Sequence, residues 1–122
     1  MSRALVSIID DDDSVRKSLA SLVRSLGIDA RTFASGALFL SSDCVHLTQC
    51  MICDVAMPHM DGIELYGLIR QIGYAPPIIF MTAFWSDSLK NKALANGAVM
   101  CLEKPVHPQV IENALKELLN LP

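Results

Sequence analysis

The chain has 122 residues, which fits one compact domain with a single buried core and leaves no room for a second. Apolar residues make up 52% of the chain and charged residues 19%, a balance that excludes a disordered polypeptide and favours a well-filled core. The net charge is only -3 and there are no runs of Lys and Arg, so the basic surface that nucleic-acid binding requires is absent. We expect residues 1–122 to form one domain.

The N-terminal stretch, residues 1–9, contains one Arg and a short apolar run, which is too short for a secretory signal peptide. No segment approaches the roughly 18 consecutive apolar residues of a membrane span. We therefore expect a cytoplasmic protein without a membrane partner.

The four cysteines, Cys44, Cys50, Cys53 and Cys101, could form a disulfide framework in a secreted chain, but an intracellular protein keeps its thiols reduced. The C-M-I-C spacing of the middle pair also occurs in redox motifs, which place it at the start of a helix. Here the pair lies in a predicted strand, where residues three apart point to opposite faces. We expect both to be small, buried strand residues.

Short runs rich in Val and Ile alternate with longer segments of helical spacing, which indicates repeated βα units. The first strand is predicted at residues 5–9. The helix after it is predicted to begin at an N-cap of Asp13 or Ser14 and to end at Gly27. Residues 29–33 form a weak, polar strand that suits the edge of a sheet.

The rest of the chain continues this alternation. In chain order we expect a short helix, then strand and helix in turn, at residues 37–40, 50–53, 63–72, 78–81, 87–96, 99–102 and 108–119. The run 78–81 has no polar residue, which is typical of a parallel strand buried on both faces. The pattern favours a single doubly wound α/β domain, a five-stranded parallel sheet with helices on both faces, which binds ligands at the carboxyl ends of its strands.

The residues directly after the predicted strands carry the candidate chemistry. In chain order they are Asp10, Asp11, Asp54, Thr82 and Lys104. Three carboxylates at one edge repel each other unless a cation neutralises them, and an all-oxygen cluster suits Mg²⁺. Lys104 and Thr82 offer a positive charge and a hydroxyl donor to phosphoryl oxygens, and a carboxylate beside them can attack phosphorus. The set therefore predicts phosphoryl transfer.

Aspartates after strands are also common as turn residues and helix caps. We assign that structural role to Asp12 and Asp13, as the acidic first turn of the next helix, where the helix dipole favours negative charge. Turn chemistry does not explain a Lys-Pro pair, nor the order Asp, Thr, Lys at the ends of consecutive strands. We keep the chemical interpretation for the other residues.

Four segments of the sequence resemble the receiver domain of two-component response regulators, in the CheY-like superfamily, and the resemblance covers the whole chain. They are the acidic pair Asp10-Asp11, D-V-A-M-P-H-M-D-G at 54–62, M-T-A at 81–83 and E-K-P at 103–105. Two further stretches look most like the FixJ-type subgroup, V-R-K-S-L at 15–19 and G-A-V at 97–99. The resemblance implies the flavodoxin-like strand order 2-1-3-4-5.

The resemblance also implies a metal site. Asp10 and Asp11 would hold Mg²⁺, Asp11 directly. The Asp54 carboxylate and the backbone carbonyl of Ala56 would be further ligands.

By the same resemblance, Asp54 would accept a phosphoryl group from the phosphohistidine of a sensor histidine kinase. Thr82 would swing toward that group and Lys104 would bind it from the other side, with a cis bond between Lys104 and Pro105. A receiver is not an enzyme in the ordinary sense, since it catalyses only its own phosphorylation and dephosphorylation. Phosphorylation shifts an existing equilibrium, and activated receivers of this kind often form homodimers.

The sequence ends soon after the last predicted helix, so we expect either a stand-alone receiver or one excised from a longer regulator. Similarity to the FixJ-type subgroup implies a DNA-binding output domain outside these residues, and hence control of transcription.

One position departs from the family pattern. Receivers usually carry Tyr or Phe on the last strand, as a switch coupled to the Thr, where this chain has Cys101. A thiol is too small to follow Thr82 in the same way, which leaves open a pseudo-receiver that only binds a partner. Phe84 and Trp85 lie in the loop after Thr82 and could take part, although we expect them to be partly buried.

Two other functions fit part of the pattern. A haloacid-dehalogenase-like phosphatase also uses an Asp nucleophile with Mg²⁺, but it needs a second Asp two residues later as general acid, where this chain has Ala56. A flavodoxin-like FMN-binding module needs a loop of donors after the first strand to hold phosphate, and four aspartates there would repel it.

Overall fold

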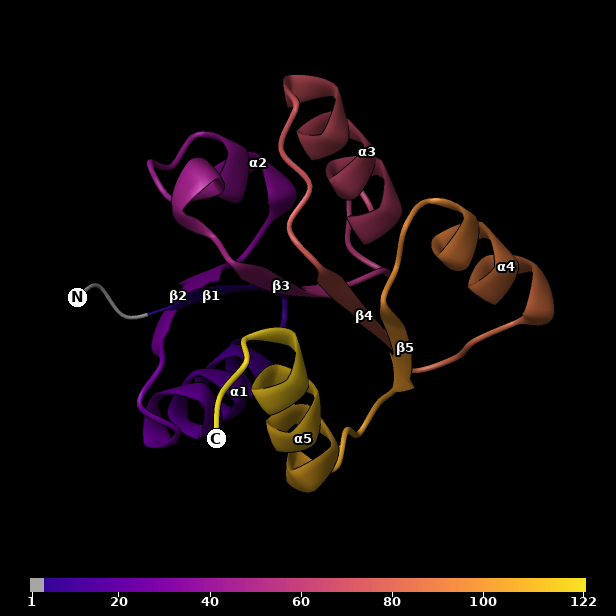
Figure 1. Cartoon of the computed structure of the whole chain (residues 1–122). Coiled ribbons are helices and arrows are strands. Elements are labelled where there is room, and N and C mark those ends of the chain that lie inside the picture. The colour runs from indigo at the N-terminus through magenta and orange to yellow at the C-terminus, as the bar shows by residue number, and fades with distance from the viewer. Residues whose placement is uncertain (1–3) are drawn as a thin grey trace.

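A computed structural model describes residues 4–122. Residues 1–3 lie outside the described residues, and they belong to the N-terminal stretch in which we expect no signal peptide. Five parallel strands form one sheet in the order β2-β1-β3-β4-β5 (Figure 1). The strands are β1 Leu5–Ile9, β2 Asp29–Phe33, β3 Cys50–Asp54, β4 Ile78–Thr82 and β5 Met100–Glu103. The α/β class and the strand order are confirmed.

Five α-helices cover the sheet, with α1 and α5 on one face and α2, α3 and α4 on the other (Figure 1). They are α1 Asp13–Ser25, α2 Gly36–Leu40, α3 Gly62–Ile72, α4 Asp87–Ala95 and α5 Pro108–Leu118. A short 3₁₀-helix, η1 Val45–Leu47, was not predicted, because a single turn has no periodic pattern to detect. Within residues 4–122, no helix has both the length and the apolar character needed to span a membrane.

Asp12, and not Asp13 or Ser14, is the N-cap of α1. Its backbone is extended, and its carboxylate accepts hydrogen bonds from the N–H groups of Ser14 at 2.8 Å and Val15 at 3.2 Å. Asp13 lies in the first turn, as expected. The predicted cap was wrong because, among four consecutive aspartates, residue type alone does not say which one takes the extended conformation that a cap requires.

Two apolar clusters, one on each face of the sheet, form the core. All five residues of β4 are buried, whereas β2 lies at the sheet edge with exposed positions, as expected for both strands. Cys50 packs on the α1 and α5 side and Cys53 on the opposite side. Burial raises the pKa of Cys50 to about 12 and the pKa of Cys53 well above its usual value, and all four cysteines are free thiols. The prediction of small, buried strand residues is confirmed.

Candidate functional site

The predicted site residues meet at the carboxyl edge of the sheet. Asp10 and Asp11 follow β1, and Asp54 is the last residue of β3, the neighbour of β1. Thr82 is the last residue of β4, and Lys104 directly follows β5. Because these strands are parallel and adjacent, the sheet brings all five side chains to one edge.

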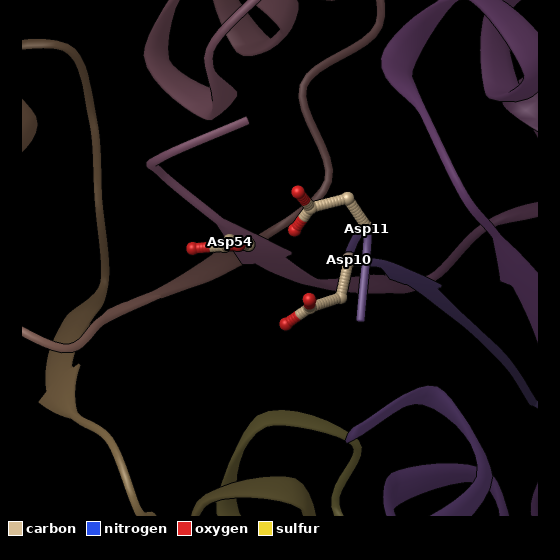
Figure 2. Close-up of side chains that lie close together, drawn as sticks. All are labelled: Asp10, Asp11 and Asp54. Carbon is tan, nitrogen blue, oxygen red and sulfur yellow. The ribbon is translucent and has the colours of Figure 1, made fainter. Parts of the chain in front are cut away.

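Asp10, Asp11 and Asp54 form an acidic cluster, in which each residue offers a carboxylate oxygen within 4.8 Å of the other two. Figure 2 shows Asp10 and Asp11 extending from one strand end toward Asp54 at the end of the next strand. Asp10 is fully buried and Asp54 is 4% exposed, while Asp11 is exposed to solvent. The cluster therefore has two buried carboxylates and one at its open side.

The Lys104 ammonium group offsets part of the negative charge. Its Nζ lies 2.7 Å from Oδ2 of Asp10 and 3.3 Å from Oδ2 of Asp54. The backbone N–H of Lys104 donates to the carbonyl of Thr82 at 2.9 Å, which fixes the lysine beside β4. Burial opposes the charge of the amine, but the contact with Asp10 and then the charge of Asp54 outweigh it and raise the pKa of Lys104. Lys104 therefore stays protonated at neutral pH.

The Asp54 carboxyl group titrates above its ordinary range. Burial and then the negative charge of Asp10 raise its pKa from 3.8 to about 6, against the opposing effects of Lys104 and of the Ala56 N–H, which donates to Oδ1 at 3.2 Å. Oδ2 of Asp10 is also buried and has no hydrogen-bond partner of suitable geometry. Its negative charge is therefore balanced by the ion pair with Lys104. The cluster holds more negative charge than the protein groups around it neutralise, and a bound cation relieves such an excess.

The N-terminus of α3 lies directly against the end of β3. The N–H of Gly62 donates to the carbonyl of Val55 at 3.0 Å, and a Cβ at Gly62 would come within 2.4 Å of the Asp54 carbonyl oxygen. Asp61 caps the helix and forms a reciprocal capping box with Glu64. Only glycine fits this close approach, so Gly62 allows the start of α3 to lie directly against the backbone of Asp54.

A family model described as the response regulator receiver domain matches residues 6–116, which is most of the chain. The chain belongs to the response regulator receiver family. The receiver is 33% identical over 118 residues to response regulator protein TodT of Pseudomonas putida, covering 97% of this chain and 52% of TodT. It is 36% identical over 114 residues to transcriptional regulatory protein FixJ of Azorhizobium caulinodans, covering 93% and 54%.

Solved structures agree with this assignment. Chemotaxis protein CheY4 of Vibrio cholerae is 28% identical to the receiver, with a TM-score of 0.88 over 96% of this chain and 99% of that chain. The predicted resemblance to CheY-like and FixJ-type receivers is confirmed. The receiver spans about half the length of the curated relatives it matches.

The region beside Thr82 carries a different aromatic contact from the one the family pattern implies. Thr82 is buried, and Cys101 on β5 is half-buried. Phe84 is 75% exposed, so the expectation of partial burial was wrong for this residue. Trp85 is half-buried as expected, and its indole N–H donates to the carbonyl of Leu102 at 2.8 Å. An indole thus attaches the loop after β4 to β5 in this receiver.

Arg16 contacts the site, a role that its place in the sequence did not predict. Its Nη1 donates to the backbone carbonyl of Asp10 at 2.7 Å. The only signal in the sequence was its place six residues after Asp10 on the predicted helix. Most arginines at such positions face solvent, so the spacing alone could not identify this contact.

Proposed function

We propose that this receiver accepts a phosphoryl group on Asp54 from the phosphohistidine of a sensor histidine kinase, with Mg²⁺ as the metal, and that the added charge switches an output. The observation that carries the proposal is the position of Asp54, whose Oδ2 lies 3.3 Å from the Lys104 ammonium group and beside two further carboxylates. We assign Asp54, Lys104 and Thr82 to the chemical step.

We assign the metal to the carboxylates of Asp10, Asp11 and Asp54 and to the backbone carbonyl of Ala56. Oxygen donors of this kind are the ligands that Mg²⁺ prefers. The excess negative charge supports the fit, because Oδ2 of Asp10 has no well-angled hydrogen bond and the Asp10 charge helps to raise the pKa of Asp54. When bound, Mg²⁺ neutralises the carboxylates and stabilises negative charge on a phosphoryl oxygen.

Asp54 supplies the nucleophilic oxygen. A new P–O bond forms as the P–N bond of the phosphohistidine breaks, and the electron pair of that bond goes to the imidazole. Lys104 stays protonated and faces the same carboxylate, so it can bind one phosphoryl oxygen by charge, and the Thr82 hydroxyl can donate to another. Ala56 offers no general acid where a phosphatase of the haloacid-dehalogenase type needs one. The aspartyl phosphate should therefore persist, which suits a phosphoacceptor rather than a turnover enzyme.

A cleft of about 610 Å³ beside Lys104 supports docking of the kinase partner. Its apolar lining comes from α1, β4 and the segment after β5, with Val15, Leu19, Met81, Pro105, Val106 and Pro108. A partner that places an apolar helix here would lie beside Lys104, the residue that contacts Asp10 and Asp54.

We further propose that residues 1–122 act as one cytoplasmic receiver domain whose phosphorylation favours a homodimer and controls transcription through a DNA-binding domain outside these residues. The greater length of the curated relatives, one of them named as a transcriptional regulatory protein, supports this output.

The test of the proposal is incubation with Mg²⁺ and a small acyl or amido phosphate, followed by mass spectrometry of the intact chain. We expect a gain of one phosphoryl group in the parent and in the control Glu117→Gln, which changes an exposed carboxylate on α5, and no gain in Asp54→Ala. A parent that gains no mass, as a pseudo-receiver would behave, overturns the proposal. A gain that persists in Asp54→Ala overturns it equally.

A further inference from the structure

Arg16 ties the end of β1 to the first turn of α1. Its Nη1 donates to the backbone carbonyl of Asp10 at 2.7 Å, and its Nη2 donates to Oδ1 of Asp13 at 3.0 Å. The side chain is only 17% exposed although it is charged. One planar guanidinium therefore holds two points of the acidic loop in fixed relation, a geometry that lysine does not reproduce.

The Asp10 carbonyl belongs to the peptide that joins Asp10 to Asp11. Because a peptide group is planar, fixing this carbonyl also fixes the direction in which the chain enters Asp11. Asp10 has other supports: its N–H donates to the carbonyl of Phe33 at 3.1 Å, and its Oδ1 accepts from the N–H of Asp12 at 2.9 Å. The Asp12 N–H belongs to the peptide that follows Asp11, so this bond holds one side of Asp11, while the Arg16 contact holds the peptide on the other side.

Asp11 is the member of the acidic cluster that needs such support. It is exposed, and within residues 4–122 its carboxylate makes no hydrogen bond or ion pair of its own. Asp10 and Asp54, in contrast, are buried and face Lys104. The backbone therefore sets where the Asp11 side chain starts from, and no described contact of its own holds the carboxylate.

We propose that Arg16 is a positioning residue of the metal site, which holds the Asp10 carbonyl and so aims the Asp11 carboxylate at a divalent cation. This inference rests on the proposed function, because it presumes that Asp10, Asp11 and Asp54 bind Mg²⁺. It makes a prediction opposite to that of simple electrostatics. Removing a positive charge near an acidic site should strengthen cation binding, whereas losing the positioning contact should weaken it.

Lys17 provides a matched control. Its Nζ lies 3.0 Å from Oδ2 of Asp13, the same carboxylate that Arg16 contacts, and its side chain is 77% exposed. Among the described interactions it makes none with Asp10. Lys17→Gln therefore removes the same charge beside the same partner and leaves the Asp10 carbonyl contact in place.

The experiment is a calorimetric titration of the metal-free protein with Mg²⁺ alone, for the parent, Arg16→Gln, Arg16→Lys and Lys17→Gln. We expect Arg16→Gln to weaken binding about tenfold, the usual effect of removing a group that orients a metal ligand. Lys17→Gln should bind as tightly as the parent or more tightly. Arg16→Lys keeps the charge but lacks the two guanidinium nitrogens that contact Asp10 and Asp13, so this variant should also bind Mg²⁺ more weakly than the parent. The amide signals of Asp11 and Asp12 in NMR spectra should shift in the two Arg16 variants and not in Lys17→Gln.

Equal affinities of Arg16→Gln and Lys17→Gln, with a parent that binds Mg²⁺, overturn the inference and leave the proposed function standing. A parent that does not bind Mg²⁺ overturns both. Circular dichroism establishes that each variant is folded. If Arg16→Gln does not fold, the comparison of Arg16→Lys with the parent decides, and unchanged affinity there overturns the inference.

Discussion

The Asp54 carboxyl group connects the candidate site to the stability of the metal-free fold. Its folded pKa of about 6 lies above the ordinary 3.8, so the folded state binds this proton more tightly than the unfolded chain. The resulting stabilisation is complete below about pH 4 and is lost as the pH rises through 6. Above pH 6 the folded protein contains a buried carboxylate that it disfavours unless a metal is present.

Asp54→Asn should therefore stabilise the metal-free protein at pH 7.5, by about 1–2 kcal/mol after allowance for screening by water. The amide keeps the shape of the side chain and an oxygen for the Ala56 N–H, and Lys104 keeps its contact with Asp10. Urea denaturation in EDTA between pH 4 and 7.5 measures the difference in unfolding free energy. The difference should shrink toward zero as the pH falls to 4, and a difference independent of pH would contradict the assignment of the raised pKa.

Single residues also show where sequence reasoning reached its limit. Asp10 and Asp54 could be placed from the sequence because each follows an apolar run, and parallel strands bring such positions together. Arg16 could not, because the sequence does not show that its guanidinium reaches the Asp10 carbonyl six residues earlier. Asp12 could not be distinguished from Asp13 as the helix cap, because both are aspartates, which suit that position, and only the backbone angles decide.

Among the secondary-structure elements, α3 begins in close contact with the end of β3, and Gly62 allows this approach. A Cβ there would meet the Asp54 carbonyl oxygen at 2.4 Å and the Cys53 sulfur at 3.0 Å. The Asp54 carbonyl oxygen is a backbone atom and cannot rotate away as a side chain could, so α3 or the end of β3 must shift. Gly67, in the same helix, has open space around its Cβ position.

We expect Gly62→Ala to destabilise the receiver by about 1–3 kcal/mol, the usual cost of overpacking. The control Gly67→Ala should be neutral or stabilising by up to about 1 kcal/mol, because alanine favours a helix over glycine. Urea denaturation of both variants gives the two free energies. Equal effects of the two substitutions would mean that the close approach of α3 to β3 is not a constraint on the fold.

The predictability of the elements followed from the strength of their patterns. The strand β4 was clear because all its residues are apolar except Thr82 at its end, and the edge position of β2 followed from its polar composition. The turn η1 has no periodic signal, and it is held by tertiary contacts: the buried Thr48 hydroxyl accepts or donates at 2.7 Å with Ser7 on β1. Phe84 was expected to be partly buried on residue type alone, but the loop points it to solvent while Trp85 makes the contact with β5.

For the whole molecule, the acidic cluster makes the fold responsive to divalent metal. A ligand that binds only the folded state raises its stability by an amount that grows with the logarithm of ligand concentration, about 1.4 kcal/mol at ten times the dissociation constant. The cluster exists only when β1 and β3 are paired, so the unfolded chain does not reproduce it. Mg²⁺ should therefore raise the midpoint of thermal unfolding.

This stabilisation should depend on both pH and Asp11. At pH 5, below the Asp54 pKa of about 6, a proton competes with the metal, so the shift in melting temperature should be smaller than at pH 7.5. Asp11→Asn should lose most of the shift because it removes the exposed ligand, while Glu117→Gln, an equal change of charge on α5, should keep it. Thermal melts with and without Mg²⁺ measure each shift. If Asp11→Asn retained the full shift, Mg²⁺ would be acting elsewhere on the surface, since a cation bound at the cluster cannot ignore the loss of one of its three carboxylates.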